Sequence, residues 1–389
     1  MSPPEPHAAP EPVGFPTDLP ALTSIRFLLA AGVAFFHYHL LWTVQDTAAT
    51  QLIERARLGV DVFFILSGFI LTHVYQRQFA EGRYHHGRFL LARIARIYPM
   101  HLAALALFLV MVLAGRSFAP GFDAAVYPWS DLGRALALVQ AWSLDPRPNA
   151  WNGPSWSLSA EWFAYLVYPA FAWLGWKLQR RPWLLLTLAG ALFAGLDLAY
   201  AAAYGRVLPR AEEALGVLRI IPTFLYGVAL YRLGERVQLS RRGALLFATG
   251  AAAGVLALLH IGADDRLIVA AAGPLVLSLA MLARPRAEGV LSSRTFVLLG
   301  EASYALYLLH LPLLIGWRYG AALLTGRSST TPLPLPEVLG LFAITVAAAI
   351  VAHLLWERPA RRWIKRWSAR TQRKPAPGVE VAPRGSPPG

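Results

Sequence analysis

The run ALTSIRFLLAAGVAFFHYHLLWT, residues 21–43, decides the fold class of this chain. It is apolar over the length of a transmembrane helix, for which about 20 residues are needed, yet it contains Arg26 and His37. The eleven helical steps between them place the two side chains within about 20° of each other around the helix and about 16 Å apart along it. Because ionisable groups at membrane depth usually serve a function, we expect this helix to line a site.

Composition extends this interpretation to all 389 residues. Hydrophobic residues make up 56% of the chain and charged residues 15%, whereas soluble domains are about 25% charged; mean hydropathy is +0.45. Apolar runs of about 20 residues recur, without the short alternating segments of outer-membrane barrels. The sequence predicts an all-α, polytopic membrane protein with about ten transmembrane helices, at 21–43, 58–76, 90–114, 155–176, 183–204, 214–232, 243–261, 266–283, 295–317 and 336–356.

The charged residues predict the orientation. The formal net charge is +14, but Lys and Arg fall at the ends of apolar segments, which disfavours a nucleic-acid partner. Loops rich in Lys and Arg alternate with mixed or acidic loops, and by the positive-inside rule the basic set is cytoplasmic. We therefore expect a multi-pass protein of the cell inner (plasma) membrane with both termini in the cytoplasm. The expected domains are a Pro-rich N-terminal tail at 1–20, a membrane domain at 21–357 and a basic, largely disordered tail at 358–389.

Two segments outside the predicted helices have sequence patterns that predict structure or function. The outside loop 115–154 is rich in Pro, Trp and Asp and is predicted to contain a short helix at 130–142; loops this long are usually functional. The C-terminal tail begins with RPARRWIKRW, residues 358–367, a pattern typical of a basic amphipathic stretch lying on the anionic inner leaflet. The chain has no Cys, which excludes disulfides, thiolate metal sites and a Cys nucleophile.

His37 is the first catalytic candidate. A neutral imidazole can accept a proton from a hydroxyl group or carry an acyl group transiently, whereas the structural alternative is a His that only bonds a neighbouring helix. Glu161 is the second, in WNGPSWSLSAEWFAYLVYP (151–169). It is expected within about two turns of the outer surface, where it can orient an imidazole, bind acceptor hydroxyls or form a buried ion pair.

Arg93 and Arg96 are the candidates for anion binding. They lie three positions apart in RFLLARIARIYP (88–99), on one face of the first turns of the third predicted helix. Helix N-termini attract anions, and Arg adds bidentate contacts to phosphate. Anchoring at the cytoplasmic surface is the simpler explanation for either residue alone. Because Arg26 approaches from the same side, a phosphate-bearing ligand is favoured at least as much as anchoring.

Further polar residues are expected to support the site. Asp61 is expected to pair with an Arg or to orient a His, while a Ser within an apolar helix most often serves helix packing. The supporting set is Asp61, Ser67, Ser157, Ser303, Tyr307 and His310. No G-x-S-x-G elbow, P-loop or H-E-x-x-H motif is present. Soluble-hydrolase and zinc mechanisms are therefore disfavoured, and no metal site is predicted.

Six motifs in order give the chain a resemblance to the acyltransferase 3 family of bacterial integral membrane proteins, over roughly residues 18–367. They are Arg26 with ten residues before His37, GVDVFFILSGF at 59–69, Arg93-x-x-Arg96 followed by IYP, WSLSAEWFAYLVYP at 156–169, SYALYLLHLP at 303–312 and WERP at 356–359. Each motif alone is weak, but the six together are specific.

The resemblance implies that His37 is the catalytic histidine and that Arg26, Arg93 and Arg96 bind an acyl-CoA donor. It implies transfer of an acetyl or other short acyl group to a hydroxyl of an envelope or exported carbohydrate, without a tightly bound cofactor. The separation of about 16 Å between Arg26 and His37 is comparable with the reach of a pantetheine arm. Many relatives carry a fused C-terminal hydrolase-like domain, which this sequence does not include.

A transporter or flippase of lipid-linked glycans is the alternative from another class, because intramembrane charges suit it equally. The chain lacks the internal repeat that transporters often show. A scaffold subunit of an envelope complex leaves the buried ionisable groups unexplained. The acceptor stays open among O-antigen, exopolysaccharide, peptidoglycan and small glycosylated metabolites.

Overall fold

The computed structural model describes residues 14–39, 51–118 and 123–371, and within these ranges the regular elements are helical. The α-helices are α1 Pro20–His39, α2 Leu52–Arg55, α3 Gly59–Ala80, α4 His86–Phe118, α5 Trp129–Ala137, α6 Trp156–Leu166, α7 Tyr168–Lys177, α8 Pro182–Tyr204, α9 Val217–Gly234, α10 Arg241–His260, α11 Asp265–Leu282, α12 Arg294–Thr325, α13 Leu335–Ala352 and α14 Arg358–Thr371. Short 3-10 turns are η1 Ala56–Leu58, η2 Ala124–Val126, η3 Gln140–Trp142, η4 Gly153–Ser155, η5 Leu208–Arg210 and η6 Gly289–Ser292, and η7 His353–Glu357 is a π-helical turn.

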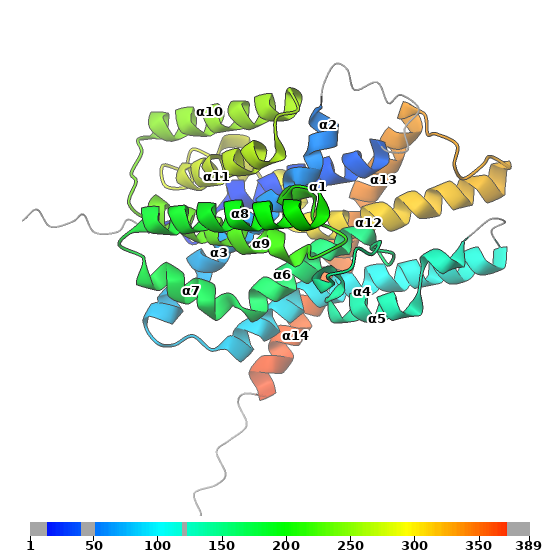
Figure 1. Cartoon of the computed structure of the whole chain (residues 1–389), viewed down its shortest axis with the longest axis horizontal. Helices are drawn as coiled ribbons and strands as arrows, with labels where there is room; N and C mark the ends of the chain where they lie inside the picture. Colours follow the sequence, from blue (N-terminus) through cyan, green and yellow to red (C-terminus); the bar gives the residue numbers. More distant parts are fainter. Residues whose placement is uncertain (1–13, 40–50, 119–122, 372–389) are drawn as a thin grey trace, which may run out of the picture.

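Nine helical stretches of the described chain are long and apolar enough to cross a membrane. They are α1, α2 with α3, α4, each of α8 to α12, and α13 with α14. Figure 1 shows α8 and α10 running along the long axis of the molecule. The predicted all-α, polytopic membrane fold is confirmed. Residues 40–43 of the first predicted helix lie outside the described ranges, and α4 and α12 are longer than predicted.

The helix predicted at 155–176 is divided in two. α6 ends at Leu166 and α7 begins at Tyr168, because Pro169 has no N–H for the carbonyl of Tyr165 and its ring crowds that carbonyl. Four other prolines lie inside unbroken helices: Pro99, Pro222, Pro274 and Pro312. Membrane bundles tolerate them where neighbouring groups satisfy the freed carbonyls. In the described chain, the ten predicted crossings thus correspond to nine unbroken stretches and the α6–α7 pair.

Two close helix crossings position the residues of the site. A Cβ added to Gly68 would lie 2.0 Å from the carbonyl oxygen of Phe224, so α3 and α9 touch backbone to backbone, with Gly227 at the same crossing. At Gly300, a Cβ would lie 2.0 Å from the carbonyl oxygen of Thr23, so α1 and α12 touch in the same way. Small residues permit such approaches in membrane bundles. As a result, α1 lies against α12 and α3 against α9.

The two additional segments predicted from the sequence form helices. α5 occupies most of the predicted 130–142 helix and is fixed to the bundle by a contact of 2.8 Å between His101 Nε2 and the Ala135 carbonyl. α14 follows α13 through the π-helical turn and leaves the bundle at an angle to α8 and α10 (Figure 1). Residues 372–389 of the predicted disordered tail lie outside the described ranges.

Candidate functional site

A cationic cavity of about 550 Å³ opens among α1, α3, α4, α6, α12 and the α13–α14 stretch. Its charged lining residues are Arg26, Arg93, Arg96, Arg358, Arg361 and Lys365, together with Glu161, Glu301 and Glu357. Six cations against three carboxylates leave an excess of positive charge. A concave site lined in this way attracts an anionic ligand.

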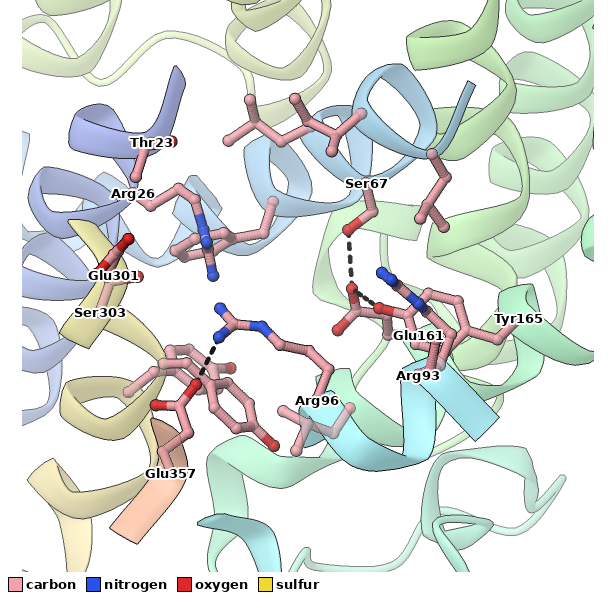
Figure 2. Close-up of a pocket in the computed structure, with 18 of the residues that line it drawn as sticks. Thr23, Arg26, Ser67, Arg93, Arg96, Glu161, Tyr165, Glu301, Ser303 and Glu357 are labelled. Carbon is pink, nitrogen blue, oxygen red and sulfur yellow. Dashed lines mark hydrogen bonds and ion pairs between the residues drawn. The ribbon is translucent and has the colours of Figure 1, made fainter. Parts of the chain in front are cut away.

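The three predicted donor-binding arginines all reach this cavity, but they differ in their partners. Arg96 Nη1 donates to Glu357 at 2.5 Å, and its guanidinium lies 5.5 Å from the centre of the Tyr304 ring. Arg93 lies against Tyr75, Phe89 and Tyr165. Arg26 forms no hydrogen bond or ion pair with any residue that the structure describes. Figure 2 shows the Arg26 and Arg96 side chains projecting toward one another across the cavity.

The position of Arg93 and Arg96 corrects one part of the prediction. α4 begins at His86 rather than near residue 90, so the two arginines occupy its eighth and eleventh positions. The unpaired N–H groups and the helix dipole act only within the first turn. The guanidinium groups, and not the helix N-terminus, therefore supply the positive charge here.

Glu161 lines the same cavity as Arg26, Arg93 and Arg96. It accepts hydrogen bonds from Ser67 Oγ at 2.8 Å and from the Tyr165 hydroxyl at 2.5 Å (Figure 2). The sequence had suggested a place nearer the opposite surface. The difference arises because the chain enters the bundle before α6 begins: Trp151 and Asn152 are buried. α6 consequently starts deep, and the hydrogen-bond partners of Glu161 among the described residues do not include an imidazole.

His37 lies against His310 of α12. His37 Nδ1 is 2.9 Å from the Val33 carbonyl oxygen and 3.2 Å from His310 Nε2. His310 Nδ1 is 2.7 Å from the Tyr307 carbonyl oxygen. Carbonyl oxygens only accept, so the network assigns the proton to Nδ1 in both rings. His310 Nε2 then accepts from His37, and His37 Nε2 keeps the lone pair that can take a proton from a hydroxyl group.

Tyr307 separates the cavity from the two imidazoles. Its ring lines the cavity and lies 5.9 Å from the His310 ring and 6.2 Å from the ring of Phe63, another lining residue. The Tyr307 hydroxyl donates to the Pro154 carbonyl and contacts Ser157 Oγ at 2.8 Å. Ser303 also lines the cavity, one turn of α12 from Tyr307. His37 itself does not line the cavity.

Asp61 takes no part in the imidazole pair. Its carboxylate receives Nη2 of Arg219 at 2.6 Å and Nε at 3.3 Å, and both side chains are only 1% exposed. Arg219 also lies 4.7 Å from the centre of the Trp156 ring. Of the two roles expected for Asp61, pairing with an Arg is the one that the structure shows. This ion pair joins α3 to α9.

A second cavity, of about 450 Å³, lies at the other end of α1. Phe36, next to His37, lines it together with Arg57, Arg206, Val207, Arg210 and Glu212. The first cavity includes Arg26 from the opposite half of the same helix. The two cavities are therefore lined by opposite halves of α1, and His37 is adjacent in sequence to Phe36 of the second cavity.

Sequence reasoning missed the contributions of the chain beyond residue 356. Glu357 pairs with Arg96, and Arg361 and Lys365 line the cavity, although the tail from 358 had been assigned to a separate segment. The four-residue spacing of Arg361 and Lys365 within the basic amphipathic stretch was the available signal. The direct contact between His37 and His310 was also not predicted.

The chain is similar to known acyltransferases over nearly its whole length. The acyltransferase 3 family, described as an acyltransferase domain, matches residues 19–355. Acyltransferase MdmB of Streptomyces mycarofaciens is 29% identical over 401 residues, covering 94% of this chain and 97% of the relative. Protein 2 in the picA locus of Rhizobium radiobacter is 37% identical over 126 residues, covering 28% of this chain and 63% of that protein.

A third relative is the peptidoglycan O-acetyltransferase OatA of Listeria monocytogenes, 25% identical over 181 residues, which cover 43% of this chain and 26% of that protein. No solved structure gives a significant match. The helical bundle, with nine stretches of the described chain long and apolar enough to cross a membrane, is that of an integral membrane protein. The chain belongs to the acyltransferase 3 family and is an O-acyltransferase, which decides against the transporter alternative.

Proposed function

We propose that this protein moves an acetyl or other short acyl group from cytoplasmic acyl-CoA to a hydroxyl of an envelope or exported carbohydrate, in the inner (plasma) membrane. One observation carries the proposal. Arg26 faces Arg96 in the cationic cavity without a carboxylate partner among the described residues, and His37 lies about 16 Å further along the same helix against His310.

The donor would bind with its phosphates at the arginines and its acyl end directed inward. Arg supplies planar, bidentate contacts to phosphate, and the aromatic rings around Arg93 hold its guanidinium in place. Tyr307 and Phe63 line the cavity and His37 does not, so the proposal requires lining side chains such as Tyr307, which contacts His310, to move when the donor is bound. Such substrate-linked motions are common in enzymes.

The transfer step follows from the assigned protonation. His37 Nε2 takes the proton of the acceptor hydroxyl as that oxygen attacks the thioester carbonyl. The C–S bond then breaks, the CoA thiolate leaves, and the proton on His37 passes to sulfur, giving an ester and free CoA thiol. The second His, His310, accepts from His37 Nδ1 beside the Val33 carbonyl and acts as a positioning residue for the His37 ring.

The acceptor would arrive at the opposite end of α1. The second cavity, beside Phe36, combines arginines and an acid, groups that can hydrogen-bond hydroxyl-rich ligands. The Listeria relative is named for O-acetylation of peptidoglycan, which supports a carbohydrate acceptor. Purified protein in nanodiscs is expected to release CoA thiol from acetyl-CoA, and cells without the gene to lack ester-linked acyl groups on a surface or exported glycan. No acetyl-CoA turnover, with or without cell-envelope glycans, would refute the proposal.

Arg26→Gln tests the donor site with the least structural disturbance, because Arg26 has no described ion-pair partner to strand. Arg96→Gln, by contrast, would leave the buried Glu357 unpaired. Losing a charge-assisted contact of about 1.5–3 kcal/mol is expected to raise the KM for acetyl-CoA about 10- to 150-fold. Arg26→Lys should recover only part, since Lys lacks the bidentate fork. Arg88→Gln, an exposed position on α4, is the control, and an unchanged KM in Arg26→Gln would remove Arg26 from the donor site.

Orientation can be tested by cysteine labelling, because the chain has no native Cys. Ser117 and Gln238 are both exposed, at ends of the bundle predicted to be outside and cytoplasmic. Gln238 is preferable to Ser240, whose side chain caps α10. In intact spheroplasts an impermeant maleimide is expected to label Ser117→Cys, and Gln238→Cys only after lysis. The reverse pattern would place the cationic cavity on the outside and exclude a cytoplasmic donor.

A further inference from the structure

α14 presents two opposite faces. Relative to Arg358 at 0°, helical steps of 100° place Arg361 at about 300° and Lys365 at about 340°, whereas Trp363 and Trp367 fall at about 140° and 180°. The structure matches this pattern, because Arg361 and Lys365 line the cationic cavity, while the two Trp side chains are 67% and 55% exposed. The helix also packs against α4, which carries Arg93 and Arg96.

Arg361 and Lys365 of α14 form no ion pair or hydrogen bond with another residue in the described ranges. The charged groups near both include Arg93 and Arg96, and Glu357 and Glu301 also lie near Arg361. Glu357 is already paired with Arg96. Because like charges repel and the cations of the cavity outnumber its carboxylates, an anion bound between Arg361 and Lys365 would relieve the repulsion.

We propose that Arg361 and Lys365 form an outer phosphate subsite that binds the ribose 3′-phosphate of the donor's nucleotide. This assignment rests on the proposed function, in which Arg26, Arg93 and Arg96 take the diphosphate next to the pantetheine arm. A phosphate monoester carries about −1.5 to −2 charge at pH 7, which two cations match. Trp363 and Trp367 lie on the opposite face, where Trp is favoured at a membrane interface, and they hold α14 at the mouth of the cavity.

An anionic lipid headgroup offers the same phosphate chemistry, so the test must separate the two sources. The variant is Arg361→Gln with Lys365→Gln. Its matched control is Arg362→Gln with Arg366→Gln, which removes the same charge from exposed positions of α14 that do not line the cavity. The donors are acetyl-CoA and acetyl-3′-dephospho-CoA, compared in nanodiscs of neutral lipid and of neutral lipid with phosphatidylglycerol.

Wild type and the control variant are expected to show a KM for acetyl-CoA about tenfold below that for the dephospho donor. The double variant should lose this preference while its KM for the dephospho donor stays within about twofold. Binding of adenosine 3′,5′-bisphosphate to the His37→Ala protein, with and without the double substitution, gives a readout that needs no turnover. Lys365→Gln alone, at an exposed position, covers the case in which the double variant folds poorly.

Retention of the 3′-phosphate preference by the double variant would overturn the subsite. If phosphatidylglycerol changes the KM of the wild type but not that of the double variant, and both keep the donor preference, the two cations bind lipid. That result would also overturn the subsite. If wild type uses both donors equally, the subsite is wrong while the proposed function stands. If wild type turns over neither donor, the proposed function fails, and this inference fails with it.

Discussion

His37→Ala is expected to insert and fold like the wild type and to lose acyl transfer by about 10²- to 10⁴-fold, the usual contribution of a general base. The loss should fall on kcat, because His37 lies beyond Tyr307 and does not line the donor cavity. The KM for acetyl-CoA should therefore change little. The measurement is acetyl-CoA-dependent thiol release by purified protein in nanodiscs, with donor binding measured separately.

Two comparisons make this result specific. His85→Ala removes an exposed imidazole and should leave turnover unchanged. His310→Ala keeps the His37 base but removes the ring that contacts its Nδ1, so we expect a smaller loss together with a shifted pH profile. Turnover of well-folded His37→Ala within tenfold of the wild type would refute the catalytic assignment.

Helical periodicity was sufficient to predict that Arg93 and Arg96 face the same cavity. Arg26 and His37 share a face of α1, and Arg93 and Arg96 share a face of α4, because a regular helix has a fixed angle per residue. The arginines accordingly reach one cavity. No such rule reports which helices touch, so the contact between His37 and His310, 273 residues apart, had no signal in spacing alone.

Depth in the bundle was harder to predict than orientation around a helix. The position expected for Glu161 assumed that the chain crosses from the surface as one straight helix. Instead the segment before α6 is already buried at Asn152, whose side chain donates to the Leu308 carbonyl. Pro169 then divides the crossing. The first effect depends on a hydrogen bond to a distant backbone group and the second on a local break in the helix, and hydropathy reports neither.

The second large effect concerns stability. Asp61→Ala is expected to destabilise the protein by about 3–5 kcal/mol, because it strands a buried guanidinium without its counter-charge. Arg219 is 1% exposed and donates two hydrogen bonds to the Asp61 carboxylate. Its remaining acidic contact, Glu212 at 3.4 Å, is half-exposed and so compensates only weakly. Inactivation half-lives of purified protein at a fixed temperature measure the change.

Removing both charges of the Asp61–Arg219 pair should destabilise the protein less than removing Asp61 alone. Replacing a buried ion pair by apolar groups of similar size is often neutral, so Asp61→Ala with Arg219→Met is expected to recover most of the stability lost in Asp61→Ala. Arg77→Ala, which breaks an exposed pair with Glu81, should change stability by less than about 1 kcal/mol. If instead Asp61→Asn keeps wild-type stability but abolishes acyl transfer, Asp61 belongs to the reaction, and the pair with Arg219 is not its main role.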